Sequence, residues 1–568
     1  MKKEDILRKS FWQDNKKLFF IAFVASLILN SVNLYLSYVL QVVTDIAAGE
    51  EQSKSLLRVV IECLLVFLGM ILVSLVFAGT RNAFKAKAMK QYRDHIYEKL
   101  AKKGIGAFRK ENTSTYVSGL TNDATIIEES YLDGLFSIGE QIFLFVGSLL
   151  LMLCYSPLLT LIAIGFSLLP VLASILTGQK LVNLEKDVSS RNEKFLAMIS
   201  EILMGFSVVK SFNAEERIGR IFGNVNEALE KAKKKRNVNK VYTEMIGALS
   251  GATTQIGVFI VGAWLSIRGM GITPGMLIVF TNLLNFIIGP IGQLPALLAK
   301  KKAALALIDK MEKALTEEDA TEERKEDCQL EHSVRLSDVE FSYDGTKKVL
   351  DHLSYEFEQG KSYAIVGASG CGKSTLLQLL LAGMNGYSGN IFYDDTNIKN
   401  LRPESLYNTV STIQQNVFVF NASIRDNVTM FQEFPKEEVD RVMEMAGLQE
   451  LIAEKGEDYL CGENGSGLSG GEKQRISIAR ALLRNAKMLL IDEATAALDA
   501  ETSSRVIKAI LALKNMTRIV VTHDLDAGTL QKYDSILTLK NGRIIEDGSF
   551  DALMKNKGYF YSLYTVAQ

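Results

Sequence analysis

Six long apolar stretches in the first 300 residues constrain the fold of this 568-residue chain more than any other feature. A helix rises ~1.5 Å per residue and the hydrocarbon core of a bilayer is ~30 Å thick, so each stretch is long enough to cross a membrane. Backbone polar groups in lipid need partners within their own segment, and these spans are therefore expected to be helical. The predicted spans are 18–44, 57–79, 137–155, 157–177, 243–266 and 275–298.

The distribution of Lys and Arg predicts how the spans are oriented. Six of these residues precede the first span, and the long connections 81–135 and 178–240 carry ten and thirteen. The short connections carry only Lys54 and Arg268. Because basic residues favour the cytoplasmic side, both termini and both long connections are predicted to be cytoplasmic. Nucleic-acid binding is the alternative reading of the basic runs, but their position beside spans favours topology, and 64 basic residues balance 65 acidic ones.

The two long connections are expected to be largely helical. Residues 81–100 and 192–201 are rich in helix formers and contain no proline. The membrane helices are therefore predicted to continue for several turns beyond the bilayer. Each connection also contains a break, at 112–118 and at 213–218, where a short cross-helix is predicted.

Polar side chains recur at helical spacing in three of the spans. Such side chains are costly in lipid, so these faces are expected to point inward, towards neighbouring helices or water. Interhelical hydrogen bonding around small residues explains the pattern, and so does the lining of a translocation path; the sequence leaves both open. The residues are Asn30, Asn33, Ser37, Gln41, Asp45, Ser250, Thr254, Gly257, Asn282, Asn285, Gly289 and Gln293.

The C-terminal part of the chain reads as a soluble α/β protein. From about Val334, short β-branched runs alternate with amphipathic helices. The five cysteines are scattered without C-x-x-C spacing, which argues against a zinc site and fits a reducing cytoplasm. The predicted divisions are a cytoplasmic N-terminal segment at 1–17, a six-helix all-α transmembrane domain at 18–300, a charged linker at 301–329 and an α/β domain at 330–568.

The stretch from Gly367 to Thr375 fits the phosphate-loop pattern G-x-x-x-x-G-K-[ST]. An apolar run suited to a buried strand precedes it, and a run suited to a helix follows it. Glycines let successive N–H groups turn towards phosphates, and the helix N-terminus favours negative charge. Lys373 is predicted to reach the β- and γ-phosphates, and Ser374 to hold Mg²⁺. The loop comprises Gly367, Ala368, Ser369, Gly370, Cys371, Gly372, Lys373, Ser374 and Thr375.

Two strand ends carry further candidate groups. The apolar run 488–491 ends in Asp492 and Glu493. A carboxylate at the end of a strand parallel to that of the phosphate loop can hold Mg²⁺, and the next one can polarise an attacking water. The run 518–521 ends in Thr522 and His523, and this histidine is suited to contact a γ-phosphate. Each of these features alone has an ordinary structural explanation.

Two more candidate features lie elsewhere in the α/β domain, one before the phosphate loop and one between that loop and the run 488–491. Tyr343 lies in a turn-rich segment, where its ring is suited to stack on adenine. Ser469, Gly470 and Gly471 belong to a Leu-Ser-Gly-Gly-Glu run that opens a helical stretch, which again suits an anion. We therefore expect the α/β domain to be a P-loop ATPase.

Together these residues resemble the nucleotide-binding domain of an ATP-binding cassette (ABC) transporter. The Leu-Ser-Gly-Gly-Glu run at 468–472, between the phosphate loop and the Asp-Glu strand, is specific to this family among P-loop proteins. The membrane half resembles the exporter-type domain, with six spans, two long connections and the stretches 209–216 and 271–275. The resemblance covers nearly the whole chain and implies a half-transporter, with one membrane domain fused to one ATPase domain.

The resemblance also implies a role for each candidate residue and a second chain. Ser469, Gly470 and Gly471 would contact ATP bound to the opposite cassette, so that each site is shared by two chains. The two cross-helices would seat the membrane domain on the cassettes. The other implied roles are adenine stacking for Tyr343, phosphate binding for 367–375, Mg²⁺ contact and sensing of the membrane domain for Gln415, Mg²⁺ binding through water for Asp492, general base for Glu493 and switch histidine for His523.

Three positions depart from the usual pattern of that family. Glu472 stands where Gln is commonest, Gln414 replaces a frequent Pro, and Ala496 replaces the usual Ser. None of these changes removes a catalytic group, so ATP hydrolysis is still expected.

The resemblance implies an ATP-driven transporter that works as a dimer by alternating access and exports a drug, a lipid or a peptide. The alternatives are an importer of iron chelates on the same fold and an ATP-gated channel or regulator. The expected setting is the lipid bilayer of a bacterial plasma (inner) membrane, without nucleic acid. The sequence leaves open whether the partner chain is identical or different.

Overall fold

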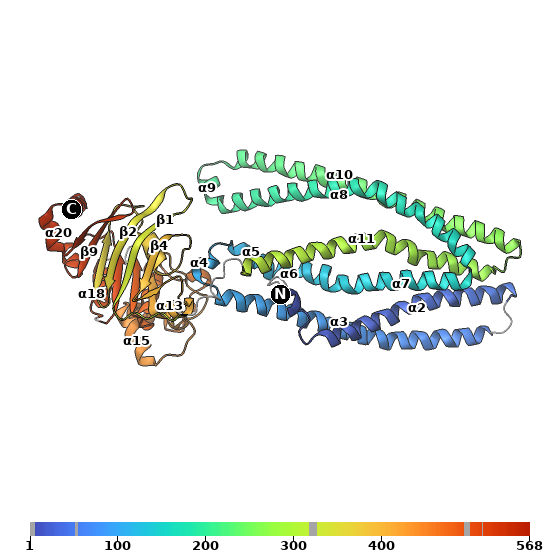
Figure 1. The fold of residues 1–568 in the computed structure, drawn as a ribbon, viewed down its shortest axis with the longest axis horizontal. Helices are drawn as coiled ribbons and strands as arrows, with labels where there is room; N and C mark the ends of the chain where they lie inside the picture. The colour runs from blue at the N-terminus through green and yellow to red at the C-terminus, as the bar shows by residue number, and fades with distance from the viewer. Residues whose placement is uncertain (1–5, 51–54, 317–325, 494–499, 514, 568) are drawn as a thin grey trace. The chain divides into compact units, whose positions relative to one another are not determined.

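The computed structural model describes residues 6–50, 55–316, 326–493, 500–513 and 515–567. The chain divides into two compact units (Figure 1). The helical unit comprises residues 1–96 and 116–313, and the cassette unit comprises residues 97–115 and 314–568.

Within the described residues, six helices are long and apolar enough to cross a membrane, as predicted. Three of them, α3, α8 and α10, contain 47, 48 and 53 residues, far more than the ~20 that a bilayer requires. The predicted continuation of the helices beyond the spans is therefore confirmed. The six are α2 (Lys16–Ala48), α3 (Leu56–Lys102), α7 (Asp133–Tyr155), α8 (Pro157–Met204), α10 (Glu215–Ile267) and α11 (Pro274–Thr316).

Shorter helices precede two of these elements. The short helix α1 (Ile6–Ser10) leads to α2. Helices α5 (Thr113–Leu120) and α6 (Asn122–Ile127) and a π-helical turn at Glu128–Leu132 lead into α7.

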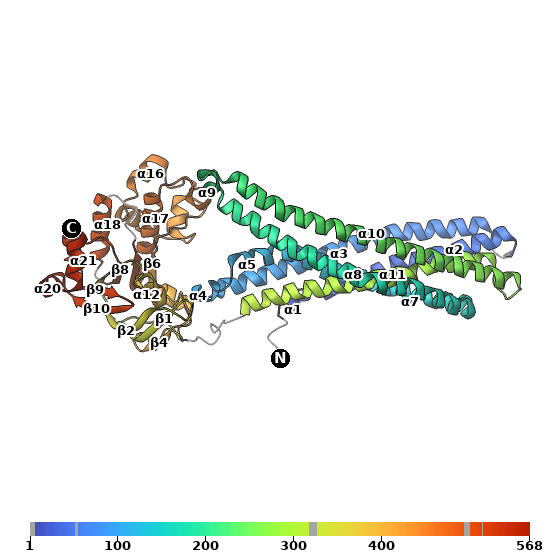
Figure 2. The same cartoon turned by 90° about the horizontal axis from the view of Figure 1, so that it is seen from above.

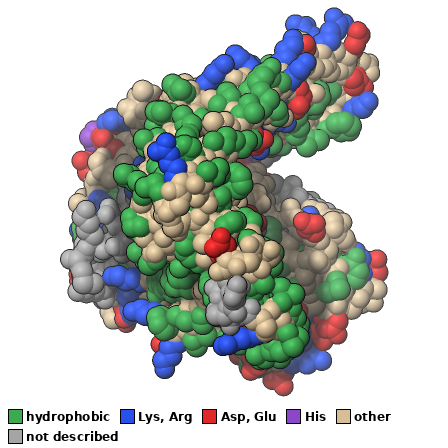
Figure 3. Space-filling model, turned by 90° about the vertical axis from the view of Figure 1, so that its right-hand side faces the viewer, with side chains coloured by type: hydrophobic (Ala, Val, Ile, Leu, Met, Phe, Trp, Pro, Cys, Tyr) green, Lys and Arg blue, Asp and Glu red, His purple; other side chains and the backbone are tan. Residues whose placement is uncertain are grey.

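The surface of the helical unit carries many exposed apolar side chains (Figure 3). Helix α3 alone exposes a run of leucines that would be costly in water and is suited to lipid. These side chains are Leu57, Leu64, Leu65, Leu68, Leu72 and Leu75.

Of the two predicted short helices, the first is confirmed and the second is not. A short helix, α5, does cover the first predicted break, but another, α4 (Ile105–Phe108), precedes it. The second prediction was wrong, because the short helix there is α9 (Phe206–Ser211) and ends before the predicted break. Asn213 has a positive φ of 50°. The segment predicted as the second short helix therefore starts with a turn, and α10 begins directly after it. Helices α8 and α10 then run side by side (Figures 1 and 2).

Several of the polar side chains predicted to face inward pair across helices. Asn282 Nδ2 of α11 donates to Ser37 Oγ of α2 at 2.9 Å. Gln255 Nε2 of α10 donates to Asn285 Oδ1 at 2.6 Å. These contacts agree with the interhelical explanation of the polar faces.

Asp45 fastens the end of α2 to the start of α11. Its Oδ1 accepts from Gly275 N at 2.8 Å, and its Oδ2 accepts from Thr273 Oγ1 at 3.0 Å. The carboxylate thereby caps the N-terminus of α11 from another helix, where negative charge is favourable. A Cβ on Gly275 would lie 2.6 Å from Asp45 Cγ and from the carbonyl oxygen of Gln41.

Gly275→Val is expected to destabilise this junction, because the added carbons overlap Asp45 and the α2 backbone. Overpacking of this kind costs about 1–3 kcal/mol. The measurement is the midpoint of thermal unfolding of the purified protein in detergent. Gly165→Val is the matched control, since Gly165 also lies in a membrane helix but a Cβ there would meet no neighbouring element within 4 Å. Equal midpoints for the two variants would contradict the described packing.

The cassette unit contains two sheets. The six-stranded sheet has the order β10-β9-β3-β8-β7-β6, in which only β10 is antiparallel to its neighbour. The four-stranded antiparallel sheet has the order β2-β1-β4-β5. The strands are β1 (Ser333–Ser342), β2 (Lys348–Glu358), β3 (Ser362–Val366), β4 (Ser388–Tyr393), β5 (Thr396–Asn397), β6 (Val410–Ile413), β7 (Met488–Asp492), β8 (Thr517–Val521), β9 (Ser535–Lys540) and β10 (Arg543–Gly548).

Strand β3 is buried on both faces, which is why its sequence is continuously apolar. Tyr363 and Ile365 join one core cluster, while Ala364 and Val366 join another. Besides α4, the helices of this unit are α12 (Lys373–Leu380), α13 (Pro403–Thr409), α14 (Ile424–Thr429), α15 (Lys436–Met445), α16 (Gln449–Lys455), α17 (Gly470–Leu483), α18 (Ala500–Leu511), α19 (Ala527–Leu530), α20 (Phe550–Asn556) and α21 (Tyr559–Ala567). The predicted fold class, an all-α membrane domain with an α/β P-loop domain, is confirmed.

Candidate nucleotide-binding site

The phosphate loop joins β3 to α12, as its sequence pattern requires. Gly372 has a φ of +108°, and a Cβ there would lie 2.8 Å from Leu350 Cδ2 and 2.9 Å from Val349 O. Glycine is therefore required at this position for both conformation and space. The loop residues Ala368, Ser369 and Gly370 lie at the surface, and α12 begins directly after Gly372. The geometry presents a helix N-terminus and an open loop to an anion.

Lys373 lies at the centre of this loop and is only 5% exposed. Its Nζ donates to the carbonyl oxygens of Gly367 and Ala368, at 2.9 and 3.2 Å. The ammonium group is thus held against the backbone of the loop that would bind phosphate, and it places a positive charge there.

Two predicted oxygen ligands meet at the end of β7. Ser374 Oγ donates to Asp492 Oδ1 at 3.1 Å. Burial raises the pKa of the Asp492 carboxyl, and the hydrogen bond from Ser374 partly opposes this shift. A hydroxyl and a carboxylate oxygen this close are a donor set that suits a hard divalent cation.

Glu493 is held between two other predicted site residues. Its Oε1 lies 2.7 Å from His523 Nε2, and its Oε2 accepts from Gln415 Nε2 at 2.9 Å. Its backbone φ is +52°, a value that residues other than glycine rarely adopt. Such strained conformations recur at active sites. Gln415, Glu493 and His523 therefore come together from the ends of three different strands, β6, β7 and β8.

Tyr343 lies beside the phosphate loop, and its hydroxyl is 3.1 Å from Thr375 Oγ1. Its ring is 64% exposed and packs edge-on against Phe341. One face of the ring is thus free to contact a flat ligand. Asp344 holds the turn of Tyr343 by accepting backbone hydrogen bonds from Thr346 and Lys347. A hydrogen bond from the Thr346 side chain, together with these two backbone bonds, lowers the pKa of the Asp344 carboxyl.

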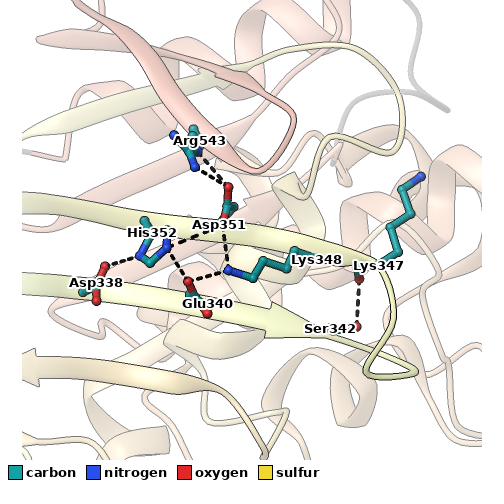
Figure 4. A network of polar contacts seen from close by, with 8 residues as sticks. All are labelled: Asp338, Glu340, Ser342, Lys347, Lys348, Asp351, His352 and Arg543. Atoms are coloured by element: carbon teal, nitrogen blue, oxygen red, sulfur yellow. Dashed lines mark hydrogen bonds and ion pairs between the residues drawn. The ribbon is translucent and has the colours of Figure 1, made fainter.

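A charged network anchors the base of the Tyr343 hairpin (Figure 4). Lys348 Nζ donates to Glu340 and Asp351, at 2.7 and 3.1 Å. His352 Nε2 also contacts Glu340 at 2.7 Å, and Arg543 pairs with Asp351. These carboxylates have the spacing of metal ligands, but the cations of Lys348 and Arg543 already neutralise them. The network therefore gives structural support to the hairpin that carries Tyr343.

The Ser-Gly-Gly run opens α17 at a distance in sequence from the phosphate loop. Ser469 is the N-cap and forms a capping box: its Oγ accepts from Glu472 N, and Glu472 Oε2 accepts from Ser469 N at 2.6 Å. Both Ser469 and Gly470 are exposed, and the hydrogen bonds described for the Ser469 side chain and N–H are with Glu472 alone. This helix N-terminus is thus presented to solvent.

Ala496, one of the departures noted in the sequence, lies outside the described residues.

Gln474 is a site residue that the sequence patterns did not single out. It is 3% exposed, and its Nε2 donates to the main-chain oxygen of Glu493 at 3.3 Å. It directly ties helix α17 to the candidate base. In the sequence it is an ordinary glutamine between Lys473 and Arg475, and only its burial in the structure identifies it.

Comparison with known families and proteins agrees with this site and fold. The family described as ABC transporter transmembrane region matches residues 19–291, and the family described as ABC transporter matches residues 350–496. An uncharacterized ABC transporter ATP-binding protein, YfiC of Bacillus subtilis, is 30% identical over 83% of this chain and 79% of its own length.

Other relatives and a solved structure cover even more of the chain. The ATP-dependent lipid A-core flippase of Vibrio vulnificus is 28% identical over 96% of this chain and 94% of its own length. The structure of a bacterial Atm1-family ABC exporter with ATP bound has a TM-score of 0.82 at 24% identity, covering 97% of this chain and 98% of that one. The chain therefore belongs to the ABC transporter family, with the exporter-type fold, and its ATPase domain uses ATP to drive transport across the membrane.

Proposed function

We propose that two copies of this chain form an exporter in which each ATP site is built from both chains. The observation that carries the proposal is the separation of roles within one chain. The phosphate loop, Asp492, Glu493 and His523 are gathered together, while the N-terminus of α17 at Ser469 faces solvent. A second cassette would supply the missing donors to the γ-phosphate, as the family resemblance implies.

Exposed apolar side chains at the turn around α9 support a second chain. Met204 and Phe212 are 79% and 78% exposed. Phe212 lines an apolar groove of about 480 Å³ that also includes Val208 and Val209. By contrast, α4 is seated within the cassette unit: Ile105 N donates to Tyr407 OH at 2.8 Å, and Arg109 Nη1 donates to Gln378 Oε1 at 2.6 Å. In the proposed dimer, α9 docks on the partner's cassette.

The residues at the end of β7 fit Mg²⁺, and we include it in the proposal. Ser374, Gln415 and Asp492 would hold it, with hard oxygen ligands of the kind it prefers. When bound, it would neutralise charge on the phosphates. Lys373 would bind the phosphates, Glu493 would accept the proton of the attacking water, and His523 would orient the γ-phosphate.

The proposed substrate is an amphipathic, lipid-like molecule that is moved outward. The flippase relatives support this class, and they do not favour the importer alternative. The polar faces of α2, α10 and α11 would line the path where they are not paired with each other. The Lys and Arg distribution supports a cytoplasmic location for the cassettes and both termini in a bacterial inner membrane.

The test is ATP-dependent translocation of a fluorescent phosphatidylethanolamine in vesicles that contain the purified protein. With MgATP, dithionite accessibility of the label should change faster than in vesicles containing Glu493→Gln, and EDTA should remove the difference. Single-particle mass measurement should show a dimer. A monomer with full ATPase activity would contradict the proposal, and a dimer that hydrolyses ATP without moving this lipid would contradict the lipid-like substrate.

A further inference from the structure

Arg480, near the end of α17, binds three backbone and side-chain oxygens of one neighbouring segment. Its Nη1 donates to Phe418 O at 2.7 Å, its Nη2 donates to Asn427 Oδ1 at 2.7 Å, and its Nε donates to Asn427 O. All three acceptors lie between β6 and the end of α14. The forked, planar guanidinium is the only side chain that can match such a set of acceptors at once.

Asn427 extends this contact and is fully buried. Its Oδ1 accepts from Phe420 N at 2.8 Å, and its Nδ2 donates to Phe420 O at 3.0 Å. The amide thus binds both backbone groups of Phe420, as a neighbouring strand would. Arg480 and Asn427 together fix the backbone of 418–420 to helix α17.

The cation of Arg480 has neutral partners. Within the described residues, no carboxylate forms an ion pair with it, and its partners are carbonyl and amide oxygens. Burial lowers the pKa of the guanidinium, which nevertheless stays charged. A partly buried cation without a counter-charge is an expensive way to stabilise a fold. A role in positioning explains the residue better than stability does.

The segment that Arg480 holds connects to two functional places. At one end, Gln415 Nε2 donates to Glu493 Oε2. Further along, Phe418 and Phe420 line a groove of about 410 Å³ whose wall also includes Ile105 of α4 and Arg480 itself. The backbone of 415–420 therefore runs from the candidate base to the surface on which α4 is seated.

Helix α17 completes a closed ring of contacts. Its first residues, at Ser469, are the proposed contact to the partner's ATP, and its Gln474 donates to Glu493 O. Arg480 lies near the other end of the same helix. The ring runs from Glu493 through Gln415 to Phe418, across to Arg480, along α17 to Gln474 and back to Glu493.

We propose that Arg480 is a positioning residue that transmits movement of α17 at the ATP site to the docking groove at Phe418 and Phe420. The inference rests on the proposed function, since it takes the N-terminus of α17 as a contact to ATP of the partner chain. When that contact closes, α17 moves as one rigid helix. Arg480 and Asn427 then carry 418–420, and with them the surface that receives the cytoplasmic helices of the membrane domain.

The test is hydrogen–deuterium exchange of the full-length dimer in lipid nanodiscs, with and without MgATP and orthovanadate. In the wild type, trapping should slow exchange in 466–475 and also in 416–420. In Arg480→Gln, protection of 466–475 should persist while that of 416–420 is lost. Its kcat for ATP should fall about tenfold with KM changed less than about twofold, because the nucleotide contacts are intact.

Two further variants make the result specific. Arg484→Gln is the matched control: Arg484 lies one turn later and lines the same groove, but it donates to Asn408 Oδ1 and not to 418–420. Protection of 416–420 should therefore persist in this variant. Arg480→Lys keeps the charge but not the fork, and should recover only part of the protection of 416–420; it also serves if Arg480→Gln does not fold.

The outcomes separate this inference from the proposed function. Unchanged protection of 416–420 in both Arg480 variants would overturn the inference alone. Loss of nucleotide trapping in both Arg480 variants would also overturn it, because Arg480 would then only maintain the ATP site. Absence of vanadate trapping in the wild type would overturn the shared-site proposal, and this inference with it.

Discussion

Glu493→Gln is expected to lower steady-state ATP hydrolysis by about 100- to 10,000-fold, the usual contribution of a general base. The carboxylate lies 2.7 Å from His523 Nε2 and 2.9 Å from Gln415 Nε2, so it is in place to accept a proton beside the γ-phosphate. An amide has nearly the same shape but cannot accept that proton. ATP affinity should change little, because the contacts of the phosphate loop are untouched. The measurements are phosphate release and equilibrium binding of a fluorescent ATP analogue.

Glu472→Gln is the control for this prediction. It makes the same chemical change in the same domain, and glutamine can also complete the capping box with Ser469. Its hydrolysis rate should remain within about twofold of the wild type. Turnover near the wild-type level in a verified Glu493→Gln dimer would exclude Glu493 as the base.

Much of the ATPase site could be predicted because its residues follow strand ends in the sequence. The apolar runs 363–366, 488–491 and 519–521 end just before Gly367, Asp492 and Thr522, and they lie in strands that are buried on both faces. Parallel strands place their carboxyl ends at one edge of the sheet, so these residues were expected to meet. The contact of Ser374 with Asp492 agrees with this expectation.

The positions of the short helices α4 and α9 do not follow from the polar breaks at 112–118 and 213–218. Gly104 and Gly205 mark the true starts, but a glycine within a long helical pattern is compatible with several conformations. The cap of α11 by Asp45 was also out of reach, since it joins residues 230 positions apart. In the sequence, Asp45 is one of several polar residues on a predicted inward face, and only the tertiary contact distinguishes it.

Arg480 and Asn427 show a second limit of the sequence. Arginine near the end of a helix is ordinarily explained by its interaction with the helix dipole. The residue instead donates to a segment more than fifty positions earlier in the chain. Two of its three acceptors are backbone oxygens, which every residue has. The pattern of side chains in the sequence therefore does not predict these contacts.

The number of ATP molecules that the dimer binds should depend on whether Lys373→Ala and Ser469→Arg lie in the same copy or in different copies. Lys373→Ala should weaken ATP binding to one phosphate loop by about 10- to 150-fold, because it removes a charge-assisted contact worth about 1.5–3 kcal/mol. Ser469→Arg should block the α17 contact to ATP. If each site is shared, Lys373→Ala in one copy and Ser469→Arg in the other damage the same site and leave the second intact. Both changes in one copy damage both sites.

The most direct test of the shared site counts ATP retained by these two dimers in a Glu493→Gln background. Two differently tagged copies are co-expressed and isolated through both tags, so that the same two substitutions are compared in different chains. The dimer with one change in each copy should retain one ATP after rapid removal of free nucleotide, and the dimer with both changes in one copy should retain almost none. The reverse result, with ATP retained only when both changes are in one copy, would mean that each chain forms its own site and would contradict the account.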